Sequence, residues 1–231
     1  METFLIITGI ASLIGGLAII YYIVRWIVRR PYKKYFNIIW KRSSALKAKN
    51  VMGGRATYVR GYRDFYKHRD TDNEIESRIK NGQHALVIGN PLAGKTRAVY
   101  QALKRLKKAV DVLIPNLVEF ETADFKIPAQ FPLKRNRVIV IDDLDKFAVL
   151  KNFSHVFQQF GDSEATLIAT CRSGDNYDLI CKKMETELQI FGKPVEISKI
   201  GRDEAIEVAQ KSEKTLPKTF DGNIGSIFMP I

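Results

Sequence analysis

The chain has 231 residues, of which 45% are hydrophobic and 27% are charged. This length fits one ordinary domain plus an appendage, and the composition excludes a collagen-like, low-complexity or largely disordered protein. The two cysteines, Cys171 and Cys181, are too few for a disulfide framework and lie in no cluster with metal-ligand spacing. The bulk of the chain is therefore expected to be intracellular and to bind no metal except an ion that a ligand brings.

Residues 4–24 form the first notable segment, because none of these 21 residues is charged. At about 1.5 Å per residue, such a helix just crosses a bilayer core of about 30 Å. Only Glu2 precedes the run, whereas Arg25, Arg29 and Arg30 follow it. This asymmetry predicts a single-pass transmembrane anchor at residues 1–28, with the rest of the chain in the cytoplasm. A buried core helix is the alternative.

The net charge of +12 is local. Residues 25–70 hold 14 Lys/Arg and 2 Asp, whereas residues 71–231 hold 23 basic and 22 acidic residues. A DNA-binding domain would carry a more widely distributed basic face. We therefore interpret residues 29–65 as a basic juxtamembrane linker that contacts anionic lipid. Nucleic acid is a minor alternative and is not expected as a partner.

Residues 84–108 combine a short apolar run, HALVIG, the loop GNPLAGKT and a segment with helical spacing. This is the strand, GxxxxGK[ST] loop and helix of a phosphate-binding loop, although a glycine-rich turn before a helix is the simpler alternative. Lys95 is predicted to contact the β- and γ-phosphates, and Thr96 to bind Mg²⁺. The residues predicted to contact the nucleotide are Gly89, Asn90, Pro91, Leu92, Ala93, Gly94, Lys95, Thr96 and Arg97.

Two further strands are predicted to end in polar residues. RVIVIDDLD, residues 137–145, should deliver Asp142 as a Mg²⁺ ligand and Asp143 as the group that orients or deprotonates the attacking water, with Asp145 a weaker candidate. TLIATCR, residues 166–172, ends in Arg172, which is placed to contact the γ-phosphate. In the alternative interpretation, these charged side chains only solvate strand ends. The absence of a guanine-reading Asn/Thr-Lys-x-Asp sequence favours adenine.

Strand and helix patterns alternate along the chain and predict an α/β fold with parallel strands covered by helices on both faces. The expected strands are 84–89, 111–115, 137–142, 165–171 and 194–199. The expected helices are 73–81, 95–108, 148–160, 176–190 and 202–213. Residues 117–136, with Pro128 and Pro132, are expected to form a loop.

Together, the phosphate-loop region, RVIVIDDLDKF, LIATCR and the C-terminal GRDEAIEVAQ resemble bacterial P-loop ATPases of the STAND class, which are related to NACHT and NB-ARC domains. The resemblance implies an ASCE-type core at residues 66–231 with a central five-stranded parallel sheet. It also implies a Walker A motif at residues 89–96, a Walker B motif at Asp142 and Asp143, and a sensor arginine at Arg172. His68-Arg69-Asp70 is similar to a short motif that such proteins place near the adenine. Because family members continue into a helical lid, the lid is expected to be incomplete here and the chain truncated or completed by another chain.

Three functions are compatible with these patterns. The first is a membrane-anchored, Mg²⁺-dependent ATP-binding switch with slow hydrolysis, acting in signalling or defence with a protein partner or as a homo-oligomer. The second is a nucleotide-binding scaffold or fragment that does not hydrolyse ATP. The third is an AAA-like motor at the membrane, which would need arginines acting across subunits, and Arg135 and Arg137 are the candidates.

Overall fold

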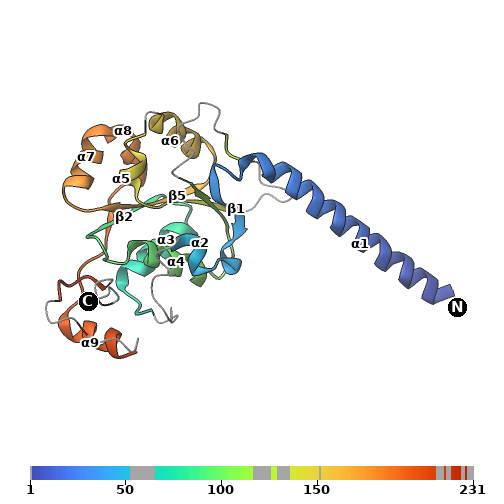
Figure 1. Cartoon of the computed structure of the whole chain (residues 1–231), viewed down its shortest axis with the longest axis horizontal. Coiled ribbons are helices and arrows are strands. Elements are labelled where there is room, and N and C mark those ends of the chain that lie inside the picture. Colours follow the sequence, from blue (N-terminus) through green and yellow to red (C-terminus); the bar gives the residue numbers. More distant parts are fainter. Residues whose placement is uncertain are drawn as a thin grey trace.

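The computed structural model describes residues 2–52, 66–116, 126–128, 136–150, 152–211, 216, 220–224 and 227, with side chains from residue 15 onward. The first element is a helix, α1 (Glu2–Arg29), which extends away from the α/β part of the molecule (Figure 1). A 3₁₀ turn, η1 (Arg30–Tyr32), follows it. A transmembrane span was expected at residues 1–28. Among the described residues, no helix is both long and apolar enough to cross a membrane.

A six-stranded sheet forms the centre of the fold, in the order β1-β3-β4-β5-β2-β6. Its strands are β1 (Phe36–Arg42), β2 (Ala85–Gly89), β3 (Asp111–Pro115), β4 (Arg137–Ile141), β5 (Thr166–Arg172) and β6 (Val195–Glu196). Strands β3, β4, β5, β2 and β6 are mutually parallel, as expected, whereas β1 pairs antiparallel with β3 at the edge. The sheet is therefore mixed and has one strand more than the sequence predicted.

Helices cover both faces of the sheet because the side chains of its buried strands alternate between two apolar cores. Leu86, Ile139 and Leu167 belong to one core, and their neighbours Val87, Val138 and Ile168 to the other. The first core lies beneath α5 (Leu144–Phe147), α6 (Phe153–Asp162), α7 (Asp175–Lys183) and α8 (Glu185–Leu188). The second lies beneath α2 (Ala48–Met52), α3 (Asp70–Lys80) and α4 (Lys95–Arg105), on the opposite side in Figure 1.

Strand β1 corrects the interpretation of residues 29–65 as a linker. Phe36, Ile38 and Trp40 are buried in the two cores, and Val51 of α2 is buried beside α4. The pairing of β1 with β3 contains two register shifts, and Trp40 has a φ of 40°. In a regular strand, Phe36, Ile38 and Trp40 would all face the same side of the sheet. The irregularities allow Ile38 to face one core while Phe36 and Trp40 face the other. Residues 36–52 are therefore part of the domain.

The remaining elements differ from expectation mainly at their ends. The helix expected at 148–160 begins later, as α6, and the short α5 precedes the expected range. The helix expected at 176–190 ends as α8 and a 3₁₀ turn, η5 (Gln189–Phe191), and the strand expected at 194–199 has only two residues. A short turn, η2 (Ser43–Ala45), follows β1, and α9 (Arg202–Lys211) lies near the C-terminal end. The loop expected at 117–136 falls largely outside the described residues.

Candidate nucleotide site

The loop after β2 has the backbone conformation of a tight turn into a helix. Gly94 precedes α4 with a φ of 91°, and Leu92 also has a positive φ, of 64°. A Cβ atom on Gly94 would lie 3.0 Å from Nη2 of Arg69 and 3.1 Å from Cγ2 of Ile224. A side chain is therefore excluded at Gly94 both by the backbone and by its neighbours. Pro91 and Leu92 are exposed at the tip of the loop.

Lys95 is folded into this loop. Its ammonium donates to the carbonyl oxygens of Gly89 at 2.9 Å and Asn90 at 2.8 Å, and only 7% of the residue is exposed. Burial lowers the pKa of Lys95, an effect that the nearby carboxylates of Asp143 and Asp142 oppose. The ammonium is thus held at the mouth of the loop by two neutral acceptors that an anionic oxygen can replace.

Asp142 lies immediately after β4 and connects three elements. Its Oδ1 accepts hydrogen bonds from the hydroxyls of Thr96 on α4 and Thr170 on β5, each at 2.7 Å. The Thr170 hydroxyl also accepts a bond from the backbone N–H of Asp143 at 2.9 Å. Because β5 lies between β4 and β2 in the sheet, its buried threonine connects the acid to the phosphate loop. The structure therefore brings Lys95, Thr96 and Asp142 together.

Asp143 is buried and has a φ of 56°, a conformation that an aspartate tolerates better than most residues. Its Oδ2 forms an ion pair with Nζ of Lys146 at 2.6 Å, one turn further along α5. The side chain of Lys146 is 44% exposed, so the ammonium can move away from the carboxylate into water. The predicted base therefore lies at the site, and Lys146 shields it.

Arg172 lies at the same edge of the sheet. It is paired in register with Gly89, the first residue of the phosphate loop. Its Nε lies 3.8 Å from Oδ2 of Asp145, whose other oxygen is buried without a hydrogen-bond partner among the described residues. The side chain of Arg172 is 39% exposed, so it is available to a ligand that reaches the loop.

Arg97 was predicted to contact the nucleotide, and its guanidinium packs between two elements. Its guanidinium lies over the rings of Tyr66 and Tyr100, 5.6 and 5.9 Å from their centroids. Burial lowers the pKa of Arg97. This side chain joins α4 to the segment before α3, a contact that accounts for it without a phosphate. Arg137 lies away from the site, because it begins β4 at the opposite end of the strand from Asp142. It forms an ion pair with Glu164 and lies over the ring of Trp40. Arg135 lies outside the described residues.

Residues 66–70 connect the loop to the C-terminal helix. Nη2 of Arg69 donates to the carbonyl of Ala93 at 3.0 Å, while its Nε and Nη1 are buried without partners among the described residues. Tyr66 donates to Asp72 at 2.8 Å, and burial together with Asp72 raises the pKa of Tyr66. Lys67 pairs with Glu207 of α9 at 2.6 Å. The His68-Arg69-Asp70 motif therefore lies beside the phosphate loop.

Sequence reasoning missed three contributors to this site: Thr170, Lys146 and Ser173. The Ser173 hydroxyl donates to the side-chain oxygen of Asn90 at 2.9 Å, just beyond β5. Thr170 could have been predicted from the sequence, because a hydroxyl within a buried apolar strand needs a hydrogen-bond partner. Lys146 could also have been predicted as a partner of Asp143, because residues three apart on a helical turn are neighbours.

No model of a protein family matches the sequence, and comparison with curated protein sequences finds no match. Similar solved structures include the ORC1 protein of Aeropyrum pernix in complex with DNA, at 13% identity and a TM-score of 0.51, covering 69% of this chain and 53% of that chain. Another is the closed state of Hsp104 with ATPγS and FITC casein, also at 13% identity and a TM-score of 0.51, covering 78% of this chain and 33% of that chain. This chain thus spans about half and a third of those proteins. At this level of identity, the likeness shows that the chain shares an α/β fold with these two proteins.

Proposed function

We propose that the protein binds ATP with Mg²⁺ and hydrolyses it slowly. The observation that carries this proposal is the meeting of Lys95, Thr96, Asp142 and Thr170 at one edge of the sheet. The two threonine hydroxyls donate to Asp142 at 2.7 Å, and the Lys95 ammonium donates to the carbonyl of Gly89 in the loop at 2.9 Å. A cation held over a loop at a helix N-terminus favours a polyphosphate. Adenine remains the expected base, because no guanine-reading sequence follows the loop.

The donor set suits magnesium. The Thr96 hydroxyl and the Asp142 carboxylate supply oxygen ligands, which a hard cation prefers, and they already lie 2.7 Å apart. Bound Mg²⁺ would neutralise charge on the β- and γ-phosphates. Asp142 would hold it directly or through water, and Thr170 would orient the carboxylate.

The residues of this chain divide the remaining work between binding and hydrolysis. Lys95 exchanges its loop carbonyls for phosphate oxygens, and Arg172 contacts the terminal phosphate from the end of β5. Asp143 accepts the proton of the attacking water once Lys146 has moved away. Because ADP lacks the group that Arg172 contacts, ATP and ADP would favour different arrangements of the site.

The decisive experiment is a binding titration of the full chain with a fluorescent ATP analogue and Mg²⁺. The full chain is required because β1 belongs to the sheet, so that removing the N-terminal residues would expose β3. Lys95→Ala should weaken binding at least about 100-fold, because it removes a charged donor to the phosphates. The matched control is Lys107→Ala, at an exposed lysine just beyond α4, which should bind as the parent does. Equal binding by Lys95→Ala and the parent would overturn the proposal.

We further propose that the protein is a STAND-type signalling or defence switch that assembles with a partner or with itself. The support is the resemblance of its motifs together with the contact of residues 66–70 with both the loop and α9. Mass photometry of the full chain in ATP and in ADP tests this proposal. A mass distribution that is identical in the two nucleotides, with both bound, would contradict it.

Association of α1 with a membrane is a third proposal, with the α/β domain on the cytoplasmic side. Its support is the set of large hydrophobic side chains that the described part of α1 exposes to solvent, which are Leu17, Ile19, Ile20, Tyr22, Ile23, Trp26 and Ile27. Cell fractionation with alkaline carbonate extraction, followed by protease protection, tests both parts. Recovery of the full chain in the soluble fraction would contradict it.

The remaining candidate function is an AAA-like motor that remodels protein or DNA, and DNA is the substrate to test because the ORC1 structure of similar fold is a DNA complex. The support within this chain is the excess of 14 Lys/Arg over 2 Asp in residues 25–70. Fluorescence anisotropy with duplex DNA at several salt concentrations tests it, because phosphate contacts give a steep salt dependence. Absence of binding at low salt would exclude DNA as the substrate of such a motor.

A further inference from the structure

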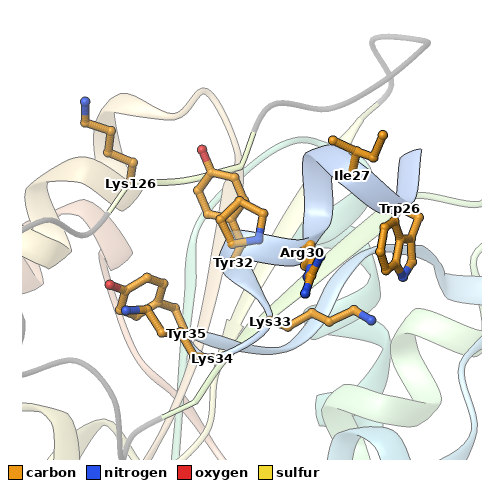
Figure 2. A pocket seen from close by; sticks show the side chains of 9 residues that line it. Trp26, Ile27, Arg30, Tyr32, Lys33, Lys34, Tyr35 and Lys126 are labelled. Carbon is orange, nitrogen blue, oxygen red and sulfur yellow. The ribbon is translucent and has the colours of Figure 1, made fainter. Parts of the chain in front are cut away.

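An open cavity of about 880 Å³ lies where α1 meets the α/β domain, at the β1 edge of the sheet and apart from the phosphate loop. Figure 2 shows that most of its lining comes from the end of α1, η1 and the turn before β1, and that Lys126 reaches it from a separate segment. The cavity uses no residue of the nucleotide site. The cavity is therefore separate from the nucleotide site.

The two walls of the cavity are held in place by the same buried residue. Nη2 of Arg29, the last residue of α1, donates to the backbone oxygen of Trp40 at 3.2 Å. The indole N–H of Trp40 donates to the carbonyl of Pro128 at 2.6 Å, which fastens the segment bearing Lys126. Trp40 itself is 2% exposed. Hydrogen bonds to one buried residue thus connect the two walls.

The turn before β1 is also held by hydrogen bonds. The backbone N–H of Asn116, just after β3, donates to the carbonyl of Tyr35 at 2.8 Å. The Asn116 side chain donates to the carbonyl of Lys34 at 3.4 Å. The backbone around the cavity is therefore ordered before any ligand arrives, as a binding site requires.

The cavity is cationic. Arg30, Lys33, Lys34 and Lys126 line it, all four residues are exposed, and the lining contains no acidic residue. Within the described part of the chain, no carboxylate forms an ion pair with Arg30, Lys33 or Lys126. Four positive charges around one hollow attract an anion with several oxygens.

Aromatic rings position two of these cations. The guanidinium of Arg30 lies 5.2 Å from the centroid of the Trp26 ring, and the ammonium of Lys34 lies 4.6 Å from that of Tyr35. Cation–π contacts hold the side chains in place and leave their charge in full. A guanidinium fork beside flexible ammonium groups suits phosphate oxygens.

We propose that this cavity binds the phosphate ester of an anionic ligand, and that the ligand is the headgroup of an anionic phospholipid. The side chains of Ile20, Ile23 and Ile27 are each more than half exposed, and Ile27 also lines the cavity. Apolar surface thus continues from α1 to the rim of a cationic hollow that contains Trp26. This combination is typical of the boundary between acyl chains and headgroups.

The test measures binding by the full chain, in nonionic detergent at 0.15 M salt, through the fluorescence of Trp26 and Trp40. The probes are short-chain phosphatidic acid, short-chain phosphatidylcholine, glycerol phosphate and inorganic phosphate. The variant is Lys33→Glu combined with Lys126→Glu, which reverses one charge on each wall. The matched control is Lys47→Glu combined with Lys49→Glu, which makes the same change in net charge at exposed positions outside the cavity.

Phosphatidic acid should bind the parent at least about tenfold more tightly than phosphatidylcholine, since each cation near an anionic headgroup adds to affinity. The Lys33/Lys126 variant should lose at least about tenfold in affinity, and the control pair less than about threefold. Equally tight binding of glycerol phosphate would support the phosphate site and assign it to a soluble ester. An equal loss in both variant pairs, or no loss in either, would overturn the proposal, and circular dichroism would verify that each variant is folded.

Discussion

The hydroxyl of Thr170 donates a hydrogen bond to Oδ1 of Asp142 at 2.7 Å, across the boundary between β5 and the acid that follows β4. The same hydroxyl accepts the backbone N–H of Asp143. One buried threonine thus positions both acids of the site relative to the phosphate loop. Its removal should therefore affect stability and Mg²⁺-dependent binding together.

Thr170→Val tests this role, because valine preserves the shape and removes the hydroxyl. We expect the free energy of unfolding to fall by about 1–3 kcal/mol, since the backbone N–H of Asp143 would stay buried without a partner. The affinity for ATP should fall more with Mg²⁺ than without it. Chemical denaturation and nucleotide titration measure the two effects. Thr166→Val is the control, at a buried threonine of the same strand, and a similar response from both variants would show that the effect is one of packing.

Lys146→Met tests whether the ion pair at 2.6 Å restrains Asp143. A carboxylate in an ion pair is a weaker proton acceptor, so we expect phosphate release at saturating ATP to increase severalfold. Asp143→Asn keeps a residue that tolerates the left-handed backbone and should abolish phosphate release while ATP still binds. The double variant should behave as Asp143→Asn. Lys183→Met, at an exposed lysine of α7, controls for the loss of charge.

Gly94→Ala should disrupt the phosphate loop. The alanine would adopt a φ of 91° and place its Cβ 3.0 Å from Nη2 of Arg69. The backbone conformation alone costs about 1–2 kcal/mol in a residue with a side chain. The melting temperature and the affinity for ATP should both fall. Gly161→Ala, in helix α6 with nothing within 4 Å of the new Cβ, should instead stabilise the fold by about 0.5–1 kcal/mol.

Cys171 should resist alkylation in the folded protein. Burial, with a further contribution from Asp145, raises the pKa of its thiol to about 12, and the thiol donates to the carbonyl of Arg172. Iodoacetamide at pH 8 should therefore modify the partly exposed Cys181 and leave Cys171 intact, whereas both should react in urea. Peptide mass mapping measures this. Equal native reaction rates would contradict the burial of Cys171.

The same pKa shift predicts how stability depends on pH. An unfolded Cys171 loses its proton near its ordinary pKa of 9.0, whereas the folded residue keeps it to about 12. The folded state then binds more protons than the unfolded state in this range. The contribution of Cys171 to stability is complete below about pH 9 and is lost as the pH rises toward 12. Urea midpoints of the parent and Cys171→Ala should converge over this range.

The local patterns predicted the strands around the nucleotide site well. An apolar run, a glycine loop and a helix follow one another at residues 84–105, and each element depends mainly on its own residues. The alternation of strands and helices was enough to predict that the strands run parallel, because a helix that connects two strands of one sheet returns the chain to the same end of that sheet. Strand β1 was not predicted, because the segment FNIIWKR lies within a stretch rich in Lys and Arg. Its pairing with β3 also depends on residues about 70 positions further along the chain.

The contacts within the site could be predicted only in part. Lys95, Thr96 and Asp142 were identified because their residue types and spacing determine their chemistry. Arg97 was assigned to the nucleotide because it follows the loop directly, but its orientation depends on Tyr66, which packing brings over α4. In the same way, Thr170 acquires its role only when β5 is inserted between β4 and β2.

The phosphate loop, the acids after β4 and the apolar character of α1 follow from residue types and their spacing along the chain, so they could be recognised before the fold was known. Which side chains face one another follows from the three-dimensional arrangement. It placed β1 at the sheet edge, Thr170 between the acid and the loop, and four cations around the hollow beside Trp40. Such contacts join segments far apart in sequence, and their geometry follows from the packing of the whole sheet.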